Sequence, residues 1–220
     1  MTTKGEPMAL NRIKKCVVAW WVMAATLPIS FASFGQIGLS DFRYGYVDFA
    51  AGSLDEKIGE NSNVTAINAG GKLPIDRRWL ATLDYSARFI HPDKTTTEIY
   101  TVLPGVAARI DAGPGLQFLA NAKAGMQWAR LTDDKTNIKL ESSNEFVWGM
   151  EVGLVYNITP RWRLATDAEL NRSDILDVEI YSLRADFRIN SGFTMGGFYS
   201  HRDSERGSTN EGGVAMKLFF

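Results

Sequence analysis

The fold class is decided by the last nine residues of the sequence, Gly212-Gly213-Val214-Ala215-Met216-Lys217-Leu218-Phe219-Phe220. Their side chains alternate between two faces, and one face carries only apolar groups: Val214, Met216, Leu218 and Phe220. The opposite face carries Ala215, Lys217 and Phe219. A period of two residues is typical of a β-strand whose two faces meet different surroundings. We therefore expect a strand that runs to the last residue.

Nine earlier stretches alternate in the same way or are bounded by turn residues. With the last stretch they predict ten strands, at 41–51, 63–73, 79–90, 97–110, 116–130, 145–158, 161–171, 178–189, 193–202 and 212–220. The third stretch is among the clearest, because Trp79, Leu83 and Phe89 share one face, opposite Asp84 and Arg88. The sequence therefore predicts an all-β protein.

The links between the predicted strands alternate in length. The short links fall near 74–77, 111–115, 159–160 and 190–192. The longer, polar links fall at 52–62, 91–96, 131–144, 172–177 and 203–211. Bacterial outer-membrane barrels have an even number of strands, short turns on the periplasmic side and longer loops outside. The pattern predicts a transmembrane antiparallel up-and-down β-barrel of about ten strands, with both of its ends on the periplasmic side.

Aromatic residues on the apolar faces indicate the height of the barrel. Trp79 and Phe89 lie ten residues apart, as do Phe118 and Trp128. Ten residues of a strand that is tilted by about 40° span about 25 Å along the membrane normal, which is the height of the lipid-facing band. We therefore predict two aromatic girdles, made of Trp79, Phe89, Phe118, Trp128, Phe146, Trp148, Tyr156, Trp162 and Phe220.

These patterns resemble those of the small Gram-negative outer-membrane β-barrel proteins. Members of that family commonly end on a Phe that the barrel assembly machinery recognises, and Phe220 has that place here. The resemblance is architectural and indicates no subfamily. It implies a location in the outer membrane, contact with outer-membrane lipid and lipopolysaccharide, and recognition of the C-terminal strand by the assembly machinery. Barrels of this size can fold as monomers, and we expect a monomer.

The N-terminal residues predict export. Lys4, Arg12, Lys14 and Lys15 precede an apolar run, 17–31, that Pro28 interrupts and that small residues follow. This order is typical of a cleaved signal peptide, and the run is too short to span a bilayer as a helix. We predict a signal peptide at residues 1–35 and a barrel domain at 36–220. An uncleaved membrane anchor is the alternative interpretation.

Composition excludes several classes of function. The chain has 24 Lys and Arg and 25 Asp and Glu; four of the former and one of the latter precede residue 36, which leaves a net charge of −4 for the predicted barrel. That charge argues against nucleic-acid binding. The single cysteine, Cys16, lies in the predicted signal peptide, so we expect neither disulfides nor a cysteine metal site. No motif for a cofactor or a metal is present.

A soluble up-and-down barrel of the lipocalin kind is the competing architecture, because period-two alternation does not reveal which face is inside. In that barrel the aromatic faces would line a ligand-binding cavity and the charged faces would meet water. The spacing of the girdles, the alternation of the links and Phe220 favour the membrane barrel.

On the membrane interpretation, the lumen encloses the charged faces of the strands. Their predicted network consists of Asp84, Arg88, Lys123, Glu151, Arg163, Asp167, Glu169, Arg184 and Asp186. Charges in a confined space are costly unless they are paired, so we expect ion pairs that plug the lumen. The predicted function is then a structural or surface-interaction role without enzymatic activity. A narrow pore for small solutes is the alternative.

A hydrolase at the outer rim is a third and weaker hypothesis. His201, Asp203 and Ser204 bring a base, a carboxylate and a hydroxyl close together in the sequence. They match neither the acid and histidine pattern of ten-stranded outer-membrane proteases nor the His-x-Ser pair of lipid A deacylases. Asp133-Asp134 resembles a cation site only weakly, because no further acidic ligand follows at loop spacing.

Overall fold

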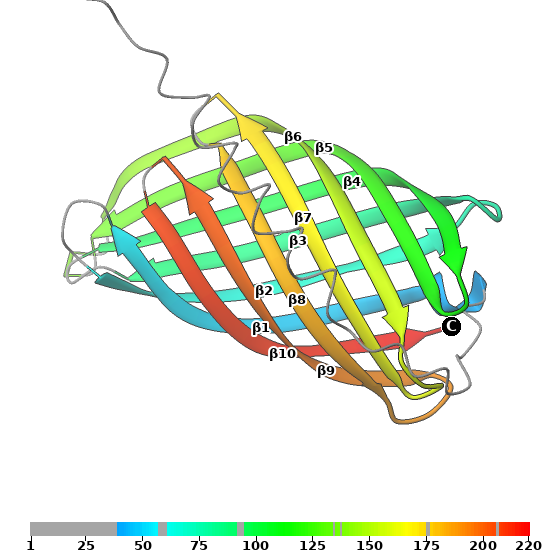
Figure 1. Ribbon diagram of the computed structural model, residues 1–220. Coiled ribbons are helices and arrows are strands. Elements are labelled where there is room, and N and C mark those ends of the chain that lie inside the picture. The colour runs from blue at the N-terminus through cyan, green and yellow to red at the C-terminus, as the bar shows by residue number, and fades with distance from the viewer. Residues whose placement is uncertain are drawn as a thin grey trace, which may run out of the picture. The chain divides into compact units, whose positions relative to one another are not determined.

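The computed structural model of the protein describes residues 39–56, 61–91, 95–133, 135–136, 138–174, 177–205 and 207–220. Ten antiparallel strands close into one barrel, in which each strand pairs with its neighbours along the chain and β1 pairs with β10 (Figure 1). The strands are β1 (Tyr44–Glu56), β2 (Asn61–Pro74), β3 (Trp79–His91), β4 (Thr95–Gly113), β5 (Leu116–Asp133), β6 (Lys139–Asn157), β7 (Trp162–Ser173), β8 (Val178–Arg188), β9 (Phe193–Ser204) and β10 (Gly207–Phe219). The predicted all-β up-and-down barrel of ten strands is confirmed.

The chain divides into two units, Met1–Ala32 and Ser33–Phe220, and the barrel belongs to the second. The predicted signal peptide, residues 1–35, lies outside the described residues and stays a prediction. Among the described residues, no helix is both long and apolar enough to cross a membrane.

The barrel closes where its first strand meets its last. Tyr44 at the start of β1 pairs with Phe219 at the end of β10, and the ladder continues to Glu56 and Gly207. The ring centroids of Tyr44 and Phe219 lie 5.4 Å apart. Because the alternating sequence 212–220 satisfies the hydrogen bonds of β1, neither strand leaves a free edge.

Several strands extend farther toward the long links than the sequence predicted. β1 continues to Glu56 and β10 begins at Gly207, although 52–62 and 203–211 were predicted as loops. β6 begins at Lys139, inside the predicted loop 131–144. These residues are mostly polar, so no change in hydrophobic pattern marks them as strand. Their backbone groups nevertheless continue the antiparallel ladders, as in the pair Asp55 and Ser208.

The first strand begins later than predicted. Residues Leu39–Phe42 form a 3-10 helix, η1, so residues 41–43 of the predicted strand 41–51 were assigned wrongly. Phe42 is 2% exposed. Packing of this ring inside the barrel accounts for the departure from the strand, which period-two alternation alone did not reveal.

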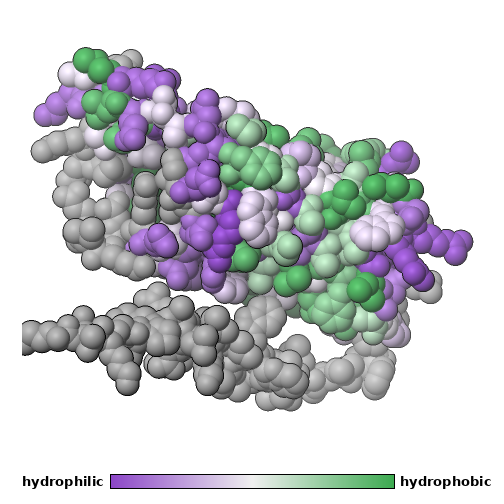
Figure 2. All heavy atoms as spheres, turned by 90° about the horizontal axis from the view of Figure 1, so that it is seen from above, coloured by the Kyte–Doolittle hydropathy of each residue, from purple (hydrophilic) through white to green (hydrophobic). Residues whose placement is uncertain are grey.

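The two faces of the wall differ as the membrane interpretation requires. Outward-facing Trp79 is 47% exposed, whereas inward-facing Lys123 is 5% exposed. Figure 2 shows hydrophobic side chains gathered on the outer wall of the barrel, with more hydrophilic regions beside them. A soluble barrel would have the opposite arrangement, so the lipocalin-like alternative is wrong.

Short turns connect the strands at the end of the barrel where Phe220 lies. Between β2 and β3, the carboxylate of Asp76 accepts hydrogen bonds from the backbone N–H groups of Arg78 (2.6 Å) and Trp79 (2.8 Å). Those bonds stabilise the charged carboxylate and hold the pKa of Asp76 below its usual value. Between β4 and β5, Gly115 has a φ of 74°, a conformation that favours glycine.

Candidate functional site: the barrel lumen

The barrel interior brings together the charged residues that the sequence assigned to it. All nine are buried or half-buried, and they come from five strands. β3 supplies Asp84 and Arg88, β5 supplies Lys123, β6 supplies Glu151, β7 supplies Arg163, Asp167 and Glu169, and β8 supplies Arg184 and Asp186.

Lys123 is the centre of the largest ion-pair cluster. Its ammonium nitrogen lies 2.8 Å from Glu151, 3.0 Å from Asp84 and 3.1 Å from Glu169. A second cation, Lys72 on β2, lies 3.8 Å from Glu151. Two lysines therefore share three carboxylates, and the Lys123 side chain is only 3% exposed.

Polar side chains complete the hydrogen bonding of this cluster. Tyr46 donates its hydroxyl to Asp84 at 2.6 Å, and the amide of Asn171 donates to Glu169 at 2.7 Å. Asp167 accepts a hydrogen bond from the hydroxyl of Ser182 at 2.5 Å. The amide of Asn121 donates to Glu151 at 3.3 Å, so each of the three carboxylates around Lys123 has a partner besides a cation, which is the condition under which buried charge is tolerated.

Two further ion pairs connect β8 with the closing strands. The guanidinium of Arg184 forms two hydrogen bonds with Asp48 on β1, at 2.5 and 3.0 Å. Lys217 on β10 donates to Asp186 at 2.5 Å, and both groups are buried. Such pairs fix the position of β8 relative to the seam between β1 and β10.

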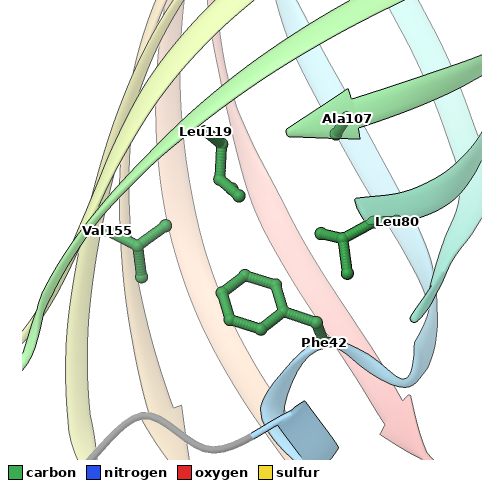
Figure 3. Packing of buried hydrophobic residues seen from close by; sticks show 5 residues of the cluster. All are labelled: Phe42, Leu80, Ala107, Leu119 and Val155. Atoms are coloured by element: carbon green, nitrogen blue, oxygen red, sulfur yellow. The ribbon is translucent and has the colours of Figure 1, made fainter. Parts of the chain in front are cut away.

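At the end of the barrel near the short turns, the interior contains an apolar cluster beside buried polar groups. Phe42 from η1 packs against Leu80, Ala107, Leu119 and Val155, which come from β3, β4, β5 and β6 (Figure 3). We call these five residues the periplasmic cluster. Leu80 and Ala107 are 0% exposed, so solvent does not reach them.

Charged groups of η1 and its surroundings anchor the periplasmic cluster. The carboxylate of Asp41 pairs with Arg188 and lies 3.6 Å from Arg163. The guanidinium of Arg109 lies 5.2 Å from the ring centroid of Phe42, a cation–π contact. η1 is thereby attached to three strands through its side chains.

At the loop-bearing end the arrangement is more open. Arg88 on β3 forms a bidentate ion pair with Glu211 on β10 inside the lumen. Arg202 on β9 also faces the interior, between Ile180 of β8 and Thr209 of β10 in the ladders. A cavity of about 800 Å³ reaches from Tyr44 and Lys217 to the hairpin residues Ser204 and Gly207.

Three carboxylates of the network were missing from the prediction: Asp41, Asp48 and Glu211. Asp48 lies between Val47 and Phe49 in a predicted strand, so period-two alternation alone could have assigned it to the lumen. Glu211 fell in a predicted loop. Asp41 reaches the lumen only through η1, and no sequence signal indicated that.

The predicted girdle residues lie on the outer wall. Trp79, Phe118, Trp162 and Phe220 are exposed near the short turns, and Trp128, Phe146 and Trp148 are exposed nearer the loops. Phe89 and Tyr156 are half-buried. Part of that burial comes from ring contacts, since the centroid of Phe89 lies 6.1 Å from that of Tyr100.

The geometry at the rim does not resemble a hydrolase site. His201 and Ser204 point to opposite faces of β9, because they are three positions apart in the strand. The Nδ1 atom of His201 lies 2.8 Å from the side-chain oxygen of Asn210, and the Ser204 hydroxyl donates to the Gly207 carbonyl. Within the described part of the chain, no group of three His, Cys, Asp or Glu residues is placed to hold a metal ion.

The outer membrane protein beta-barrel domain family matches residues 18–188 of the chain. The chain belongs to this family. Membership confirms the resemblance seen in the sequence and indicates an outer-membrane location. No related sequence was found among curated proteins.

Solved structures of other outer-membrane barrels are among those similar to this chain. The β domain of the Bordetella autotransporter BrkA has a TM-score of 0.50 and 9% identity, over 81% of this chain and 99% of that one. Neisserial surface protein A has a TM-score of 0.47 and 14% identity, over 80% and 96%. The translocator domain of the autotransporter NalP from Neisseria meningitidis has a TM-score of 0.46 and 11% identity, over 95% and 96%. At these identities the likeness concerns the fold alone.

Proposed function

We propose that the protein is a non-enzymatic outer-membrane barrel whose lumen is closed at the periplasmic end and whose outer loops make its contacts at the cell surface. The observation that carries the closed lumen is the periplasmic cluster around Phe42. The cluster fills one side of that end, and the ion pairs of Asp41 with Arg163 and Arg188 fill space beside it, so side chains that are already packed or paired obstruct a path for ions.

The ion pairs above this cluster favour the same conclusion. Lys123 is held by three carboxylates, so its charge is already compensated and cannot attract a passing anion. Barrel size agrees with closure, since interiors of eight strands are filled by side chains and open channels occur at 16–18 strands. A barrel of ten strands lies near the filled end of that range.

Strands that rise above the outer girdle support a role at the surface. β5 and β6 remain paired beyond Trp128 and Phe146, from Ala129 with Ser143 to Thr132 with Lys139. Arg130 of β5 and Lys139, Glu141 and Ser142 of β6 are exposed along this ladder. Such a ladder holds the β5–β6 loop away from the lipid, where a partner or lipopolysaccharide can reach it.

A narrow pore for small solutes is the second candidate, and the cavity of about 800 Å³ is the observation that favours it. Conduction requires a path past the periplasmic cluster. We therefore expect the cavity to be closed at one end, with water entering from the other.

Planar-bilayer recording tests the choice between the two. The protein is purified from outer membranes of an expression host, and its folded state is checked by β-sheet circular dichroism. We expect no discrete conductance steps from folded wild-type protein and steps from Phe42→Ala, which removes the central ring of the cluster. Reproducible steps from the wild type would overturn the closed barrel in favour of the pore.

We propose further that residues 1–35 direct export, that the assembly machinery reads the strand ending at Phe220, and that the barrel is a monomer in contact with lipid and lipopolysaccharide. Phe220 is 69% exposed, so its ring is available for recognition. Phe220→Ala should lower the amount of protein in the outer membrane, whereas Phe118→Ala in the same girdle should not. Equal amounts of the two variants would refute recognition through Phe220.

A further inference from the structure

We propose that the outer third of the lumen binds an amphipathic carboxylate, with its charged group on Arg202 and its aliphatic part against the wall of the cavity. This site is independent of the outer loops and of the question of conduction. It rests on a cavity, an arginine without a partner and a partly aliphatic lining.

Arg202 differs from the other lumen cations in having no ion pair. Its side chain lines the cavity, and among the described residues no hydrogen bond or ion pair reaches it. The charged groups that interact with it electrostatically are Arg88, Glu211 and Glu169. Glu211 already forms a two-fold pair with Arg88, and Glu169 lies 3.1 Å from Lys123.

The hydrogen bonding around Arg202 indicates a carboxylate ligand. Glu169 and Glu211 lie near enough to interact with its charge, but both oxygens of Glu211 bond Arg88 and Glu169 pairs with Lys123, so among the described residues no carboxylate bonds the Arg202 guanidinium directly. Glu205 lines the same cavity but is exposed in the β9–β10 hairpin, where water screens its charge. An unpaired guanidinium in a confined space is costly, and a carboxylate supplies the planar, bidentate partner that it lacks.

Aliphatic side chains form part of the cavity wall, among polar and charged ones. The residues that supply this surface are Leu54, Ile90, Ile99, Val147, Val178 and Ile180, and all of them line the cavity. Ile180 is the cross-strand neighbour of Arg202, and Ile99 is that of Arg88. Hydroxyl groups of Thr101, Ser200 and Thr209 lie among them, so the lining combines apolar and polar groups, as in ligand pockets generally.

The size and shape of the space favour a small molecule. The whole cavity, of about 800 Å³ between Tyr44 and Gly207, falls within the range of pockets that enclose drug-sized ligands, and a ligand bound to Arg202 occupies its outer part. The periplasmic cluster limits the depth to which a ligand can enter. A hydrated inorganic anion would satisfy Arg202 but would leave the aliphatic wall in contact with water, so the wall favours a carboxylate with an aliphatic chain.

Calorimetric titration with octanoate tests the proposal. Full-length protein is purified from outer membranes into lipid nanodiscs, and the heat from empty nanodiscs is subtracted. 1-Octanol, which lacks the charge, and acetate, which lacks the chain, are titrated in parallel. We expect saturable binding of octanoate that is at least about tenfold tighter than that of either comparison compound, because a charged hydrogen bond and the buried chain both contribute.

Two arginine variants distinguish octanoate binding at Arg202 from nonspecific attraction to positively charged residues. Arg202→Gln should weaken octanoate binding about tenfold or more. Arg172→Gln is the matched control, since Arg172 is an arginine on the outer wall that pairs with Asp177 and Glu179. If Arg202→Gln does not fold, Arg202→Lys keeps the charge without the bidentate geometry and should bind severalfold more weakly than the wild type.

The outcomes are decisive in both directions. Loss of octanoate affinity in the Arg202 variant, with affinity kept in the Arg172 variant, supports the site. Absence of saturable binding to folded wild-type protein overturns it, and so does equal affinity in the wild type and the Arg202 variant. None of these results depends on conductance or on the loops, so the closed barrel is tested separately.

Discussion

The two ends of the barrel interior differ in how their space is filled. At the periplasmic end, Phe42 packs against four apolar side chains and Asp41 pairs with Arg188. At the outer end, the cavity that runs along the lumen reaches the β9–β10 hairpin, and Arg202 has no ion-pair partner within the described residues. One wall of alternating strands encloses both. The alternation of residues along a strand therefore determines which side chains point into a barrel. It does not determine whether those side chains contact one another.

The largest effect is expected at the border between the two ends, at Lys123. Lys123→Met leaves Asp84, Glu151 and Glu169 with too little positive charge, so the free energy of unfolding should fall by about 5 kcal/mol. Guanidinium unfolding in detergent, followed by tryptophan fluorescence, measures it. Lys139→Met on the exposed start of β6 is the control and should leave stability unchanged. A small loss at Lys123 would show that the cluster is not compensated mainly by this residue.

Truncating an apolar side chain should cost more stability at the packed periplasmic end than beside the open cavity. Phe42→Ala empties a site that neighbours fill and should lower the free energy of unfolding by about 4 kcal/mol. Ile99→Ala enlarges a cavity that is already present. Only the free energy of removing the half-buried side chain from water is then lost, about 1 kcal/mol. The same unfolding experiment measures both. Similar losses would mean that the outer end is packed as tightly as the periplasmic end.

Two arginines test whether pairing differs along the lumen. Arg184→Met deprives buried Asp48 of its two hydrogen bonds and should lower the free energy of unfolding by about 3 kcal/mol. Arg202→Met removes a charge without a partner, so stability should change by less than about 1 kcal/mol or rise. The denaturant midpoints of unfolding of the two variants, compared with that of the wild type, measure both effects. A large loss at Arg202 would reveal that its charge is compensated in the unliganded barrel.

The smallest effect concerns the turns outside the membrane. The backbone N–H groups of Arg78 and Trp79 hold the pKa of Asp76 below its usual value. Its contribution to stability is therefore present above the unfolded pKa, near 4, and is lost as the pH falls through the lower folded pKa. Asp76→Asn should flatten the pH dependence of the unfolding midpoint between about pH 5 and pH 2. Unchanged dependence would mean that other carboxylates dominate it.

Asp133 offers the corresponding measurement at the loop-bearing end. The backbone N–H and the hydroxyl of Thr136 and the backbone N–H of Lys135 lower the pKa of Asp133. Asp133→Asn should therefore resemble Asp76→Asn in direction, because both carboxylates are exposed and bonded by backbone donors. A response from one variant alone would indicate that only one end of the barrel unfolds cooperatively over this pH range.

Most of the fold was predictable, because membrane barrels repeat one local rule. Alternation located all ten strands, and their links assigned each strand end to a side of the membrane. The errors occurred in segments where polar and apolar residues do not alternate. Polar extensions such as 52–56 and 207–211 look like loops, yet their backbones pair with neighbouring strands. Residues 39–42 form η1 because Phe42 finds an apolar space inside the barrel.

The sequence by itself determined the class of the protein, the faces of its strands and the placement of Asp84, Lys123 and Glu151 in one lumen. These follow from a period of two residues and from the spacing of aromatic rings. Only the tertiary structure decided which charges pair, because the register and closure of the barrel bring together residues as distant as Arg88 and Glu211. It also decided that Phe42 fills one end while Arg202 stands beside a cavity at the other, since packing depends on the shape of the enclosed space.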